Sequence, residues 1–494
     1  MKISIIALLL ILIMLFACTE NTVKNDTPSD TDASSVETEK ADPLAHIKFE
    51  DFGGYNFNML IINQGSITYD NVSLYVEEET FDNINDAAYL RNRMLEEKFN
   101  ITFSAMMIAE ANMTASIRNS VNSADNAYDI VCPRMTQASA LAADGYLLNL
   151  NNVPNIDMNR NYWDQDAIRD SSLAKKLYML TGDLMTVQHD CTYITMFNLE
   201  LYNDLGYTDN LYEVVRQNKW TYDKFYEIVS DSRATADLNG DGVLDREDRF
   251  GNMSDTISPR IWYVGNGEVI IGKDKDDLPF LPENTSKKND ILSKVVTMMY
   301  NGSITIMVDG PKPIRILNTE NVWTEANAMF AEGNIMFRIA ALRGLKDFRA
   351  MNANFGVLPV PMYDTNQPRY NHLVGTQLTD CITIPSTAPN AARTGLIVEA
   401  MAAASTETVL YAFYDRTLVT KLTRDEDSVD MLDIIFSTRI YDPGITYNFG
   451  GIYGYFVTMA TDTTYTYERM IAQYGQKIQS EIDTTIEKYL NSEN

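Results

Sequence analysis

The chain has 494 residues, of which 45% are hydrophobic and 22% charged, and this balance excludes collagen-like, disordered and multispanning membrane proteins. The length predicts more than one structural unit. The formal net charge of −28, from 40 Lys and Arg against 68 Asp and Glu, argues against nucleic acid as a partner and against a basic patch that binds lipid headgroups.

Residues 1–17 have the features of an export signal. Met1-Lys2 gives a positive start, and residues 3–16 are apolar except for Ser4. As a helix this stretch spans ~21 Å, less than the ~30 Å of a hydrocarbon core, which favours a signal peptide over a permanent membrane span. It ends in Leu15-Phe16-Ala17-Cys18, which resembles the bacterial lipobox, where the Cys is lipidated and becomes the mature N-terminus. The alternative is an ordinary secretory signal in which Cys18 is incidental.

Residues 18–46 are polar and rich in Ser, Thr, Asp and Glu. Such a segment buries too little apolar surface to fold, so we expect a disordered tether. A signal, a lipid-attachment Cys18, a tether and a folded body together predict an exported protein anchored on the outer face of a membrane.

The first part of the body alternates strand and helix patterns. Asp82 is positioned to cap a helix whose apolar face includes Ile84 and Leu90. In chain order we expect a strand over 55–61, this helix, a strand over 101–106, a helix over 111–122 and a strand over 128–132. This order predicts a parallel α/β sheet with crossover helices.

The rest of the chain continues the α/β pattern. We expect helices over 221–236, 289–300 and 390–405, a strand over 355–359 and a final amphipathic helix over 471–490. Three further cysteines, Cys132, Cys191 and Cys381, lie in apolar stretches without metal-site spacing, which predicts buried free thiols.

One motif predicts metal binding. The first six residues of the acidic loop 237–248 fit the calcium-loop pattern D-x-[DN]-x-[DN]-G. Gly242 permits the sharp turn of such a loop. The expected oxygen ligands are Asp237, Asn239, Asp241, the Val243 carbonyl, Asp245 and Asp248. The alternative is an Asx-rich surface turn without metal. Calcium sensors carry such loops in pairs. Because this chain contains only one, we expect any bound calcium to have a structural role.

Catalytic signatures are poor. The chain has three histidines, His46, His189 and His372, and none of the zinc-protease, nucleophile-elbow or P-loop motifs. Among 68 acidic residues a glycosidase-like pair could be chosen anywhere, so such a pair carries no information. The sequence therefore favours a binding protein over an enzyme.

Six stretches resemble consecutive blocks of family 1 extracellular solute-binding proteins, the sugar-binding lipoproteins of ABC importers, in their clostridial form. They are Tyr162-Trp163-Asp164-Gln165-Asp166-Ala167, Leu177-Tyr178-Met179-Leu180-Thr181-Gly182-Asp183, Phe197-Asn198-Leu199-Glu200-Leu201, Lys219-Trp220-Thr221-Tyr222-Asp223-Lys224-Phe225, Phe355-Gly356-Val357-Leu358-Pro359-Val360-Pro361 and Met431-Leu432-Asp433-Ile434-Ile435-Phe436. Their order and number carry the resemblance, which covers most of the chain after the tether.

The resemblance implies an α/β, two-lobed periplasmic-binding-protein-like fold with a hinge and an interlobe ligand cleft. The first lobe would combine residues 47–190 with 361–436, and the second 191–360 with 437–494. The chain would cross between the lobes near Cys191-Thr192 and near Leu358-Pro359.

Sugar recognition narrows the candidates in the cleft, since pyranose faces stack on aromatic rings and hydroxyl groups bind carboxylates, amides and guanidinium groups. The ligand-binding candidates at the lobe interface are Asp190, Asp255, Trp262, Arg343 and Tyr453, and Arg134 after the third strand is a further one. For Asp190, a local cap or ion pair is the alternative. For Trp262 it is core packing, and for Arg343 a solvated helix position.

The resemblance implies a lipid-anchored solute-binding subunit at the extracytoplasmic face of the cell membrane. It would be a monomer without enzymatic activity that captures a small carbohydrate and delivers it to ABC permease subunits. Calcium in the loop 237–248 would be its cofactor. The alternatives are a surface glycoside hydrolase and an adhesive lipoprotein.

Overall fold

The computed structural model describes residues 42–63, 73–310, 321–348, 354–414 and 426–492. The predicted signal 1–17, the lipidation residue Cys18 and nearly all of the predicted tether lie outside these residues. The compact unit begins at Pro43, somewhat before the predicted start of the body at residue 47. Leu44 is buried, and His46 Nε2 lies 3.0 Å from the hydroxyl of Tyr162, so the last residues of the predicted tether pack on the body.

The first sheet has the predicted strand–helix alternation. It is formed by β1 (Tyr55–Ile62), β2 (Ile101–Ile108) and β3 (Ile130–Cys132), all parallel and in the order β2-β1-β3. The connecting helices are α2 (Asn83–Phe99) and α3 (Glu110–Ser123), and α4 (Met135–Ala143) follows β3. Asp82 caps α2 as predicted, because its side chain accepts hydrogen bonds from the N–H groups of Ile84 and Asn85. The cap and the strand order of the first sheet are thus as predicted, whereas Leu90, expected on the apolar face of α2, is 55% exposed.

The second sheet has five strands in the order β10-β4-β9-β5-β8. Their bounds are β4 (Tyr193–Asn198), β5 (Phe250–Ser254), β8 (Thr305–Met307), β9 (Ile335–Ala341) and β10 (Phe355–Leu358). The sheet is mixed: β4 runs antiparallel to β10 and β9, while β5 is parallel to β8 and β9. Because β5 and β8 are parallel neighbours, their carboxyl ends meet at one edge.

In the described residues, six helices are associated with this sheet. They are α7 (Leu199–Asp204), α8 (Leu211–Arg216), α9 (Tyr222–Val229), α10 (Ser258–Gly265), α11 (Ser286–Met299) and α12 (Val322–Ala331), of which α9 and α11 were predicted. Between α10 and α11, β6 (Gly272–Lys273) and β7 (Pro279–Phe280) form a hairpin. The helix predicted to reach residue 236 ends at Val229, because Ala236 pairs with Arg249 in an antiparallel bridge.

Three extended segments that connect the two sheets lie together. β11 (His372–Leu373) pairs in parallel with β12 (Arg439–Ile440), and Thr192 bridges to Val374. Gly375 N–H donates to the carbonyl of Cys191 at 2.9 Å. We call these segments, residues 191–193, 372–375 and 439–441, the connecting ladder. Short helices flank it: α5 (Gln165–Ser171), α6 (Val187–Asp190) and α15 (Pro443–Thr446).

The predicted crossing near Cys191-Thr192 coincides with the connecting ladder, but Leu358-Pro359 stays with the second sheet. Thr195 Oγ1 and Trp220 Nε1 both donate to the Pro359 carbonyl, at 3.0 and 2.8 Å. The chain returns to the first sheet later, where Thr383 bridges to Val131. The second crossing therefore lies about where β11 does, and the exact lobe boundaries stay a prediction.

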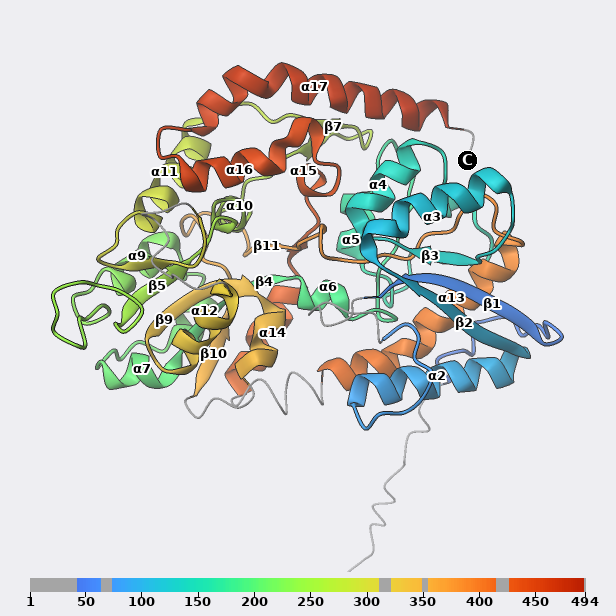
Figure 1. The fold of residues 1–494 in the computed structure, drawn as a ribbon, viewed down its shortest axis with the longest axis horizontal. Helices are drawn as coiled ribbons and strands as arrows, with labels where there is room; N and C mark the ends of the chain where they lie inside the picture. The colour runs from blue at the N-terminus through green and yellow to red at the C-terminus, as the bar shows by residue number, and fades with distance from the viewer. Residues whose placement is uncertain (1–41, 64–72, 311–320, 349–353, 415–425, 493–494) are drawn as a thin grey trace, which may run out of the picture. The chain divides into compact units, whose positions relative to one another are not determined.

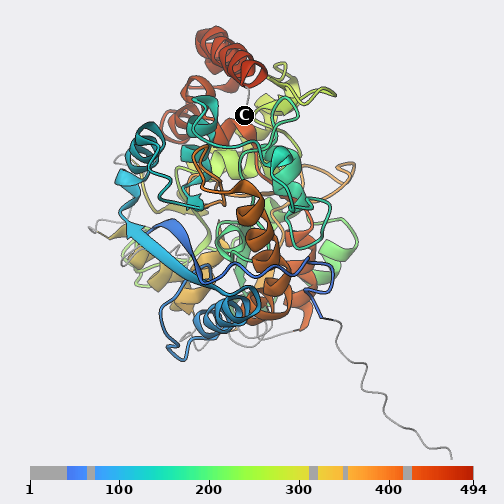
Figure 2. The same cartoon turned by 90° about the vertical axis from the view of Figure 1, so that its right-hand side faces the viewer.

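The C-terminal part is helical. α13 (Ala391–Ser405) packs against α2, as Figures 1 and 2 show, whereas α14 (Glu426–Phe436) packs against β10. α16 (Ile452–Thr461) and α17 (Tyr467–Asn491) follow, and the predicted apolar stripe of α17 is buried at Ile478 and Ile482. In the described residues, one helix, Ala391–Tyr414, is long and apolar enough to cross a membrane, but 72% of its apolar window is buried inside the protein, as in a core helix. The predicted thiols Cys132, Cys191 and Cys381 are buried and free.

Candidate functional site

Two carboxylates lie where the parallel strands β5 and β8 end. Asp255 follows β5 directly, and it accepts hydrogen bonds from Ser258 Oγ at 2.9 Å and from the N–H of Ile257 at 3.1 Å. Asp309 follows β8 and accepts from both the N–H and the Oγ1 of Thr256 at 2.8 Å. Burial, and then the charge of Asp309, raise the pKa of Asp255 to about 6. This edge therefore holds a buried carboxyl group whose charge changes close to neutral pH.

A buried guanidinium lies in the first turn of α10. Nη2 of Arg260 donates to the hydroxyl of Tyr453 on α16 at 2.8 Å, and its Cζ lies 3.9 Å from the centroid of the same ring, a cation–π contact. Arg260 is 1% exposed, and its Nε and Nη1 have no hydrogen-bond partner in the described part of the chain. Leaving a buried charged donor unpaired costs free energy, so this geometry favours an acceptor supplied by a ligand.

Two more polar side chains complete this group. Tyr193 opens β4, and burial raises its pKa to about 12 while the nearby charge of Arg260 opposes that rise, so its hydroxyl stays a donor. A Cβ on Gly375 would lie at contact distance from both the Tyr193 hydroxyl, 3.5 Å, and Gln377 Nε2, 3.4 Å, so these two side chains lie on the same side of Gly375. Gln377 Oε1 is buried and accepts no hydrogen bond from any described residue. We call Tyr193, Asp255, Arg260, Gln377 and Tyr453 the Arg260 cluster.

Asp190 and Arg343 lie elsewhere. Asp190 ends α6 and is buried, with Oδ2 accepting from Lys346 Nζ at 2.5 Å, which matches the ion pair considered as its alternative. Its Oδ1 has no hydrogen-bond partner within the described ranges. Arg343 is half-buried in the short 3₁₀ segment η2 (Leu342–Phe348). The described contacts of Asp190 and Arg343 do not include any member of the Arg260 cluster. Their role as ligand-binding residues stays a prediction.

Trp262 lies in the core, contrary to the expectation that its ring faces a cleft. It is 1% exposed, and its ring makes edge-to-face contacts with Tyr222 and Phe225 at centroid distances of 5.4 and 5.2 Å. On a short helix, Trp262 and Arg260 are two residues apart and point to different sides. The helix therefore presents Arg260 to the cluster and Trp262 to the core.

Arg134, the further candidate after the third strand, holds a chain segment in place. It forms a buried ion pair with Asp380 at 2.9 Å, donates to the carbonyl of Leu378 and binds Glu110 Oε2 at 3.2 Å. These contacts tie β3 to the segment that leads from the connecting ladder back to the first sheet. With these partners, Arg134 is a structural residue in this arrangement.

The acidic side chains of the loop 237–248 accept hydrogen bonds from backbone N–H groups of the same loop. Asp237 accepts from the N–H groups of Gly240 and Gly242 at 2.7 and 2.9 Å, and buried Asp248 accepts from Leu238 and Asp245. Gly242 has a φ of 82°, a left-handed conformation that the turn requires. Among the residues described, no three His, Cys, Asp or Glu side chains gather as a metal site would need. The donor set contains only oxygen, the type that calcium prefers, so calcium binding stays a prediction.

Sequence reasoning missed Arg260, Tyr193 and Gln377 as individual residues. Arg260 carries a signal that could have found it, since it is the single charged residue between Asp255 and Glu268. Tyr193 and Gln377 have no such signal in the sequence, because only the fold brings these two residues close to Arg260. The Arg260 cluster combines unpaired N–H donors, an acceptor oxygen, a titrating carboxyl group and tyrosine rings. This set matches a neutral molecule with several hydroxyl groups.

No protein-family model matches the chain, and no curated protein matches it in sequence. Solved structures do resemble it. An ABC substrate-binding protein from Listeria monocytogenes in complex with cycloalternan is 10% identical, with a TM-score of 0.53 over 88% of this chain and 98% of the other. A cyclo/maltodextrin-binding protein complexed with maltotetraose is 12% identical, with a TM-score of 0.53 over 88% and 97%. A sugar transporter from Rhizobium etli in an open conformation is 12% identical, with a TM-score of 0.54 over 89% and 100%.

At this identity the likeness establishes the fold. The chain has the two-lobed, periplasmic-binding-protein-like α/β fold of ABC sugar-binding proteins, as the sequence predicted. The agreement extends over nearly the full length of each of these structures. The resemblance to the clostridial form in particular stays a prediction.

Proposed function

We propose that this protein is the carbohydrate-binding subunit of an ABC importer and that the Arg260 cluster contacts the solute. The observation that carries the proposal is the buried guanidinium of Arg260, which stacks on Tyr453 and keeps two N–H donors unpaired among the described residues. A sugar hydroxyl accepts from such donors and donates to a carboxylate such as Asp255. The solved structures with the same fold include one bound to maltotetraose and one bound to cycloalternan, which supports a carbohydrate ligand.

Release to a permease and attachment to a membrane are parts of the same proposal that rest on the sequence. The apolar stretch of residues 3–16 followed by Cys18 supports export and lipidation, and the polar segment after it supports a tether. We propose a monomeric, non-enzymatic subunit on the extracytoplasmic face of the cell membrane, with ABC permease subunits as partners.

We also propose that the loop 237–248 binds calcium with a structural role. Its side chains provide only oxygen donors, and Gly242 has the positive φ that such loops need. Arg246, within the loop, pairs with Glu325 and Glu332, so an ordered loop also supports α12 and the residue that follows it. Calcium would gather the carboxylates of Asp237 and Asp241, which exchange their backbone hydrogen bonds for the ion.

The experiment that tests the main proposal is a thermal-shift screen of the mature chain with mono- and oligosaccharides, followed by calorimetry. One class of sugar should raise the melting temperature, since stabilisation follows RT ln(1 + [L]/Kd). Turnover of chromogenic glycosides, measured in parallel, separates a binder from a hydrolase. A flat sugar panel, or cleavage of a glycoside that a carboxylate substitution abolishes, contradicts the proposal.

A further inference from the structure

The chain contains three Asn-Gly pairs, which are Asn239-Gly240, Asn266-Gly267 and Asn301-Gly302. An Asn that precedes a Gly closes a five-membered succinimide ring with particular ease, because a residue without Cβ leaves its backbone nitrogen unhindered. The reaction needs contact with water, an Asn carbonyl that is polarised for attack, and a backbone N–H that can lose its proton. These requirements separate the three pairs.

Asn301-Gly302 lies in the turn between α11 and β8. The backbone carbonyl of Asn301 accepts from the N–H groups of Ile304 and Thr305 at 3.0 and 2.9 Å, which holds the turn. Gly302 and Ser303 are exposed, and Asn301 is half-buried. No described residue accepts from the Gly302 N–H. This nitrogen is therefore open to water and free to lose its proton.

Ser303 donates two hydrogen bonds to the side chain of Asn301. Its N–H donates to Oδ1 at 3.1 Å, and its hydroxyl donates to the same oxygen at 2.6 Å. Both donors make Cγ more electrophilic and stabilise the negative charge that develops on Oδ1 during attack, as an oxyanion hole does. At Asn239 the corresponding oxygen accepts from the N–H of Asp241 at 3.0 Å and from no hydroxyl of a described residue.

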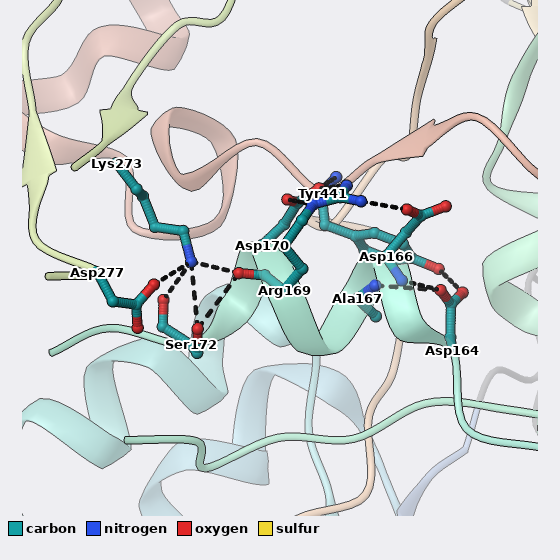
Figure 3. Close-up of polar contacts among 9 residues, drawn as sticks. All are labelled: Asp164, Asp166, Ala167, Arg169, Asp170, Ser172, Lys273, Asp277 and Tyr441. Carbon is teal, nitrogen blue, oxygen red and sulfur yellow. Dashed lines mark hydrogen bonds and ion pairs between the residues drawn. The ribbon is translucent and has the colours of Figure 1, made fainter. Parts of the chain in front are cut away.

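Asn239-Gly240 is exposed, but its nucleophile is held. The Gly240 N–H donates to Asp237 Oδ1 at 2.7 Å. Figure 3 shows bonds of the same kind at the start of α5, where the N–H groups of Asp166 and Ala167 donate to Asp164. A carboxylate that accepts from an N–H group opposes the loss of that proton, because deprotonation would place two negative charges side by side. This pair should react slowly.

Asn266-Gly267 is closed off from water. Asn266 is 1% exposed, and its Nδ2 donates to the carbonyl of Pro361 at 3.0 Å. The Gly267 N–H donates to the carbonyl of Val264 at 3.0 Å. With the side chain buried and the nucleophile paired, this pair should be inert in the folded protein.

We propose that Asn301 is a site of spontaneous deamidation and that it reacts before Asn239 and Asn266. The Gly302 nitrogen gives its proton to hydroxide and attacks Cγ of Asn301. The N–Cγ bond forms, the Cγ–Nδ2 bond breaks, and ammonia leaves. One water then opens the ring at Cγ, which gives aspartate, or at the backbone carbonyl carbon, which gives isoaspartate. Nothing is oxidised or reduced, and water is the only co-reactant.

The modification falls where it weakens the fold. It adds a negative charge directly after α11, whose C-terminal carbonyl groups already carry partial negative charge. Isoaspartate also inserts a side-chain carbon into the backbone of the turn that leads into β8. The Ile304 carbonyl in this turn accepts from the N–H of Asn252 at 2.9 Å, a contact with β5. The protein should therefore lose stability as it ages, and this inference does not rest on sugar binding.

The test incubates the mature chain at mildly alkaline pH in water labelled with oxygen-18 and follows each pair by peptide mass spectrometry. A chelator is present, so that the loop 237–248 is compared without calcium. We expect Asn301 to take up label at least tenfold faster than Asn239 or Asn266, at a rate that rises with pH. In urea the three rates should differ less than tenfold, because the fold no longer separates the pairs.

Two variants test the residues that make Asn301 reactive. Gly302→Ala should slow the reaction at least tenfold, and it should fold, because a Cβ there meets nothing within 4 Å. Ser303→Ala should slow it at least threefold, whereas Ser480→Ala, on the exposed face of α17, should leave the rate unchanged. The deamidated protein, separated by anion exchange, should melt at a lower temperature than the intact protein.

Each contrary outcome counts against a named part of the inference. Faster labelling of Asn239 or Asn266 than of Asn301 overturns the proposal, as does an Asn301 that stays unlabelled while it reacts in urea. The same ranking in urea as in the folded protein refutes the role assigned to the fold. Full reactivity of Ser303→Ala refutes the role of its donors, and equal melting refutes the loss of stability. A flat sugar screen has no bearing on any of these results.

Discussion

The substitution Arg260→Met should change the stability of the ligand-free protein and its affinity for sugar in opposite directions. The substitution keeps most of the side-chain volume and removes a buried charge whose Nε and Nη1 are unpaired among the described residues. Removing such groups should stabilise the ligand-free protein by roughly 1–3 kcal/mol, because the unpaired donors are a cost only in the folded state. Tyr453 is half-buried, so its hydroxyl retains access to water after losing its donor.

The effect on ligand binding should be opposite in sign. A hydrogen bond from a charged donor contributes about 1.5–3 kcal/mol, so losing two of them should weaken sugar binding roughly 10²- to 10⁴-fold. Calorimetry with the sugar found in the screen measures the affinity, and chemical denaturation without sugar measures the stability. Arg233→Met is the matched comparison, since Arg233 pairs with Asp231 at the surface, outside the cluster, and its loss should leave the affinity unchanged. Unchanged affinity in Arg260→Met, or a ligand-free protein that is less stable, would refute the reasoning.

Three further predictions concern single features. Calcium should raise the melting temperature of the unsubstituted protein, and replacing Asp237 and Asp241 together by Ala should abolish that rise; an unsubstituted protein that melts alike with and without calcium rules out the metal. Asp255 has a pKa raised from 3.8 to about 6 in the fold, so folding favours its protonated form; its contribution to stability is fully present below pH 4 and is lost as pH rises through 6. This loss is on the order of 3 kcal/mol and should be absent in Asp255→Asn by denaturation at pH 4 and pH 7. Trp262→Phe should cost about 1–3 kcal/mol of stability through the lost packing against Tyr222 and leave sugar affinity unchanged by calorimetry, whereas a large affinity loss would return Trp262 to the binding site.

Secondary-structure elements that depend on residues close together in the sequence were predictable. The Asp82 cap and the alternation around Tyr55 are local signals, and both elements formed where expected. The end of α9 was missed because the pairing of Ala236 with Arg249 overrides the helical pattern. Tertiary pairing of this kind leaves no periodic trace in the sequence.

The candidate site was predictable only in part. Asp255 and Tyr453 were named individually, and the fold brings them to the same arginine, although Arg260 and Tyr453 are 193 residues apart. The side of α10 on which each residue lies could not be inferred, since a helix of 8 residues buried on nearly every side has no clear apolar face. For this reason the sequence favoured Trp262, whereas Arg260 is the residue of α10 that contacts Tyr453.

The return of the chain to its first sheet has a consequence for the order in which the protein folds. Thr383 donates to the carbonyl of Val131, 252 residues earlier, so the first sheet lacks part of its packing until that later segment has been synthesised. Pairing across such a long loop is slow, because the chain must be ordered before the contact forms. The N-terminal half therefore stays incompletely folded during much of synthesis. For a chain that is exported across a membrane, as proposed above, this delay would keep the polypeptide unfolded for longer before export.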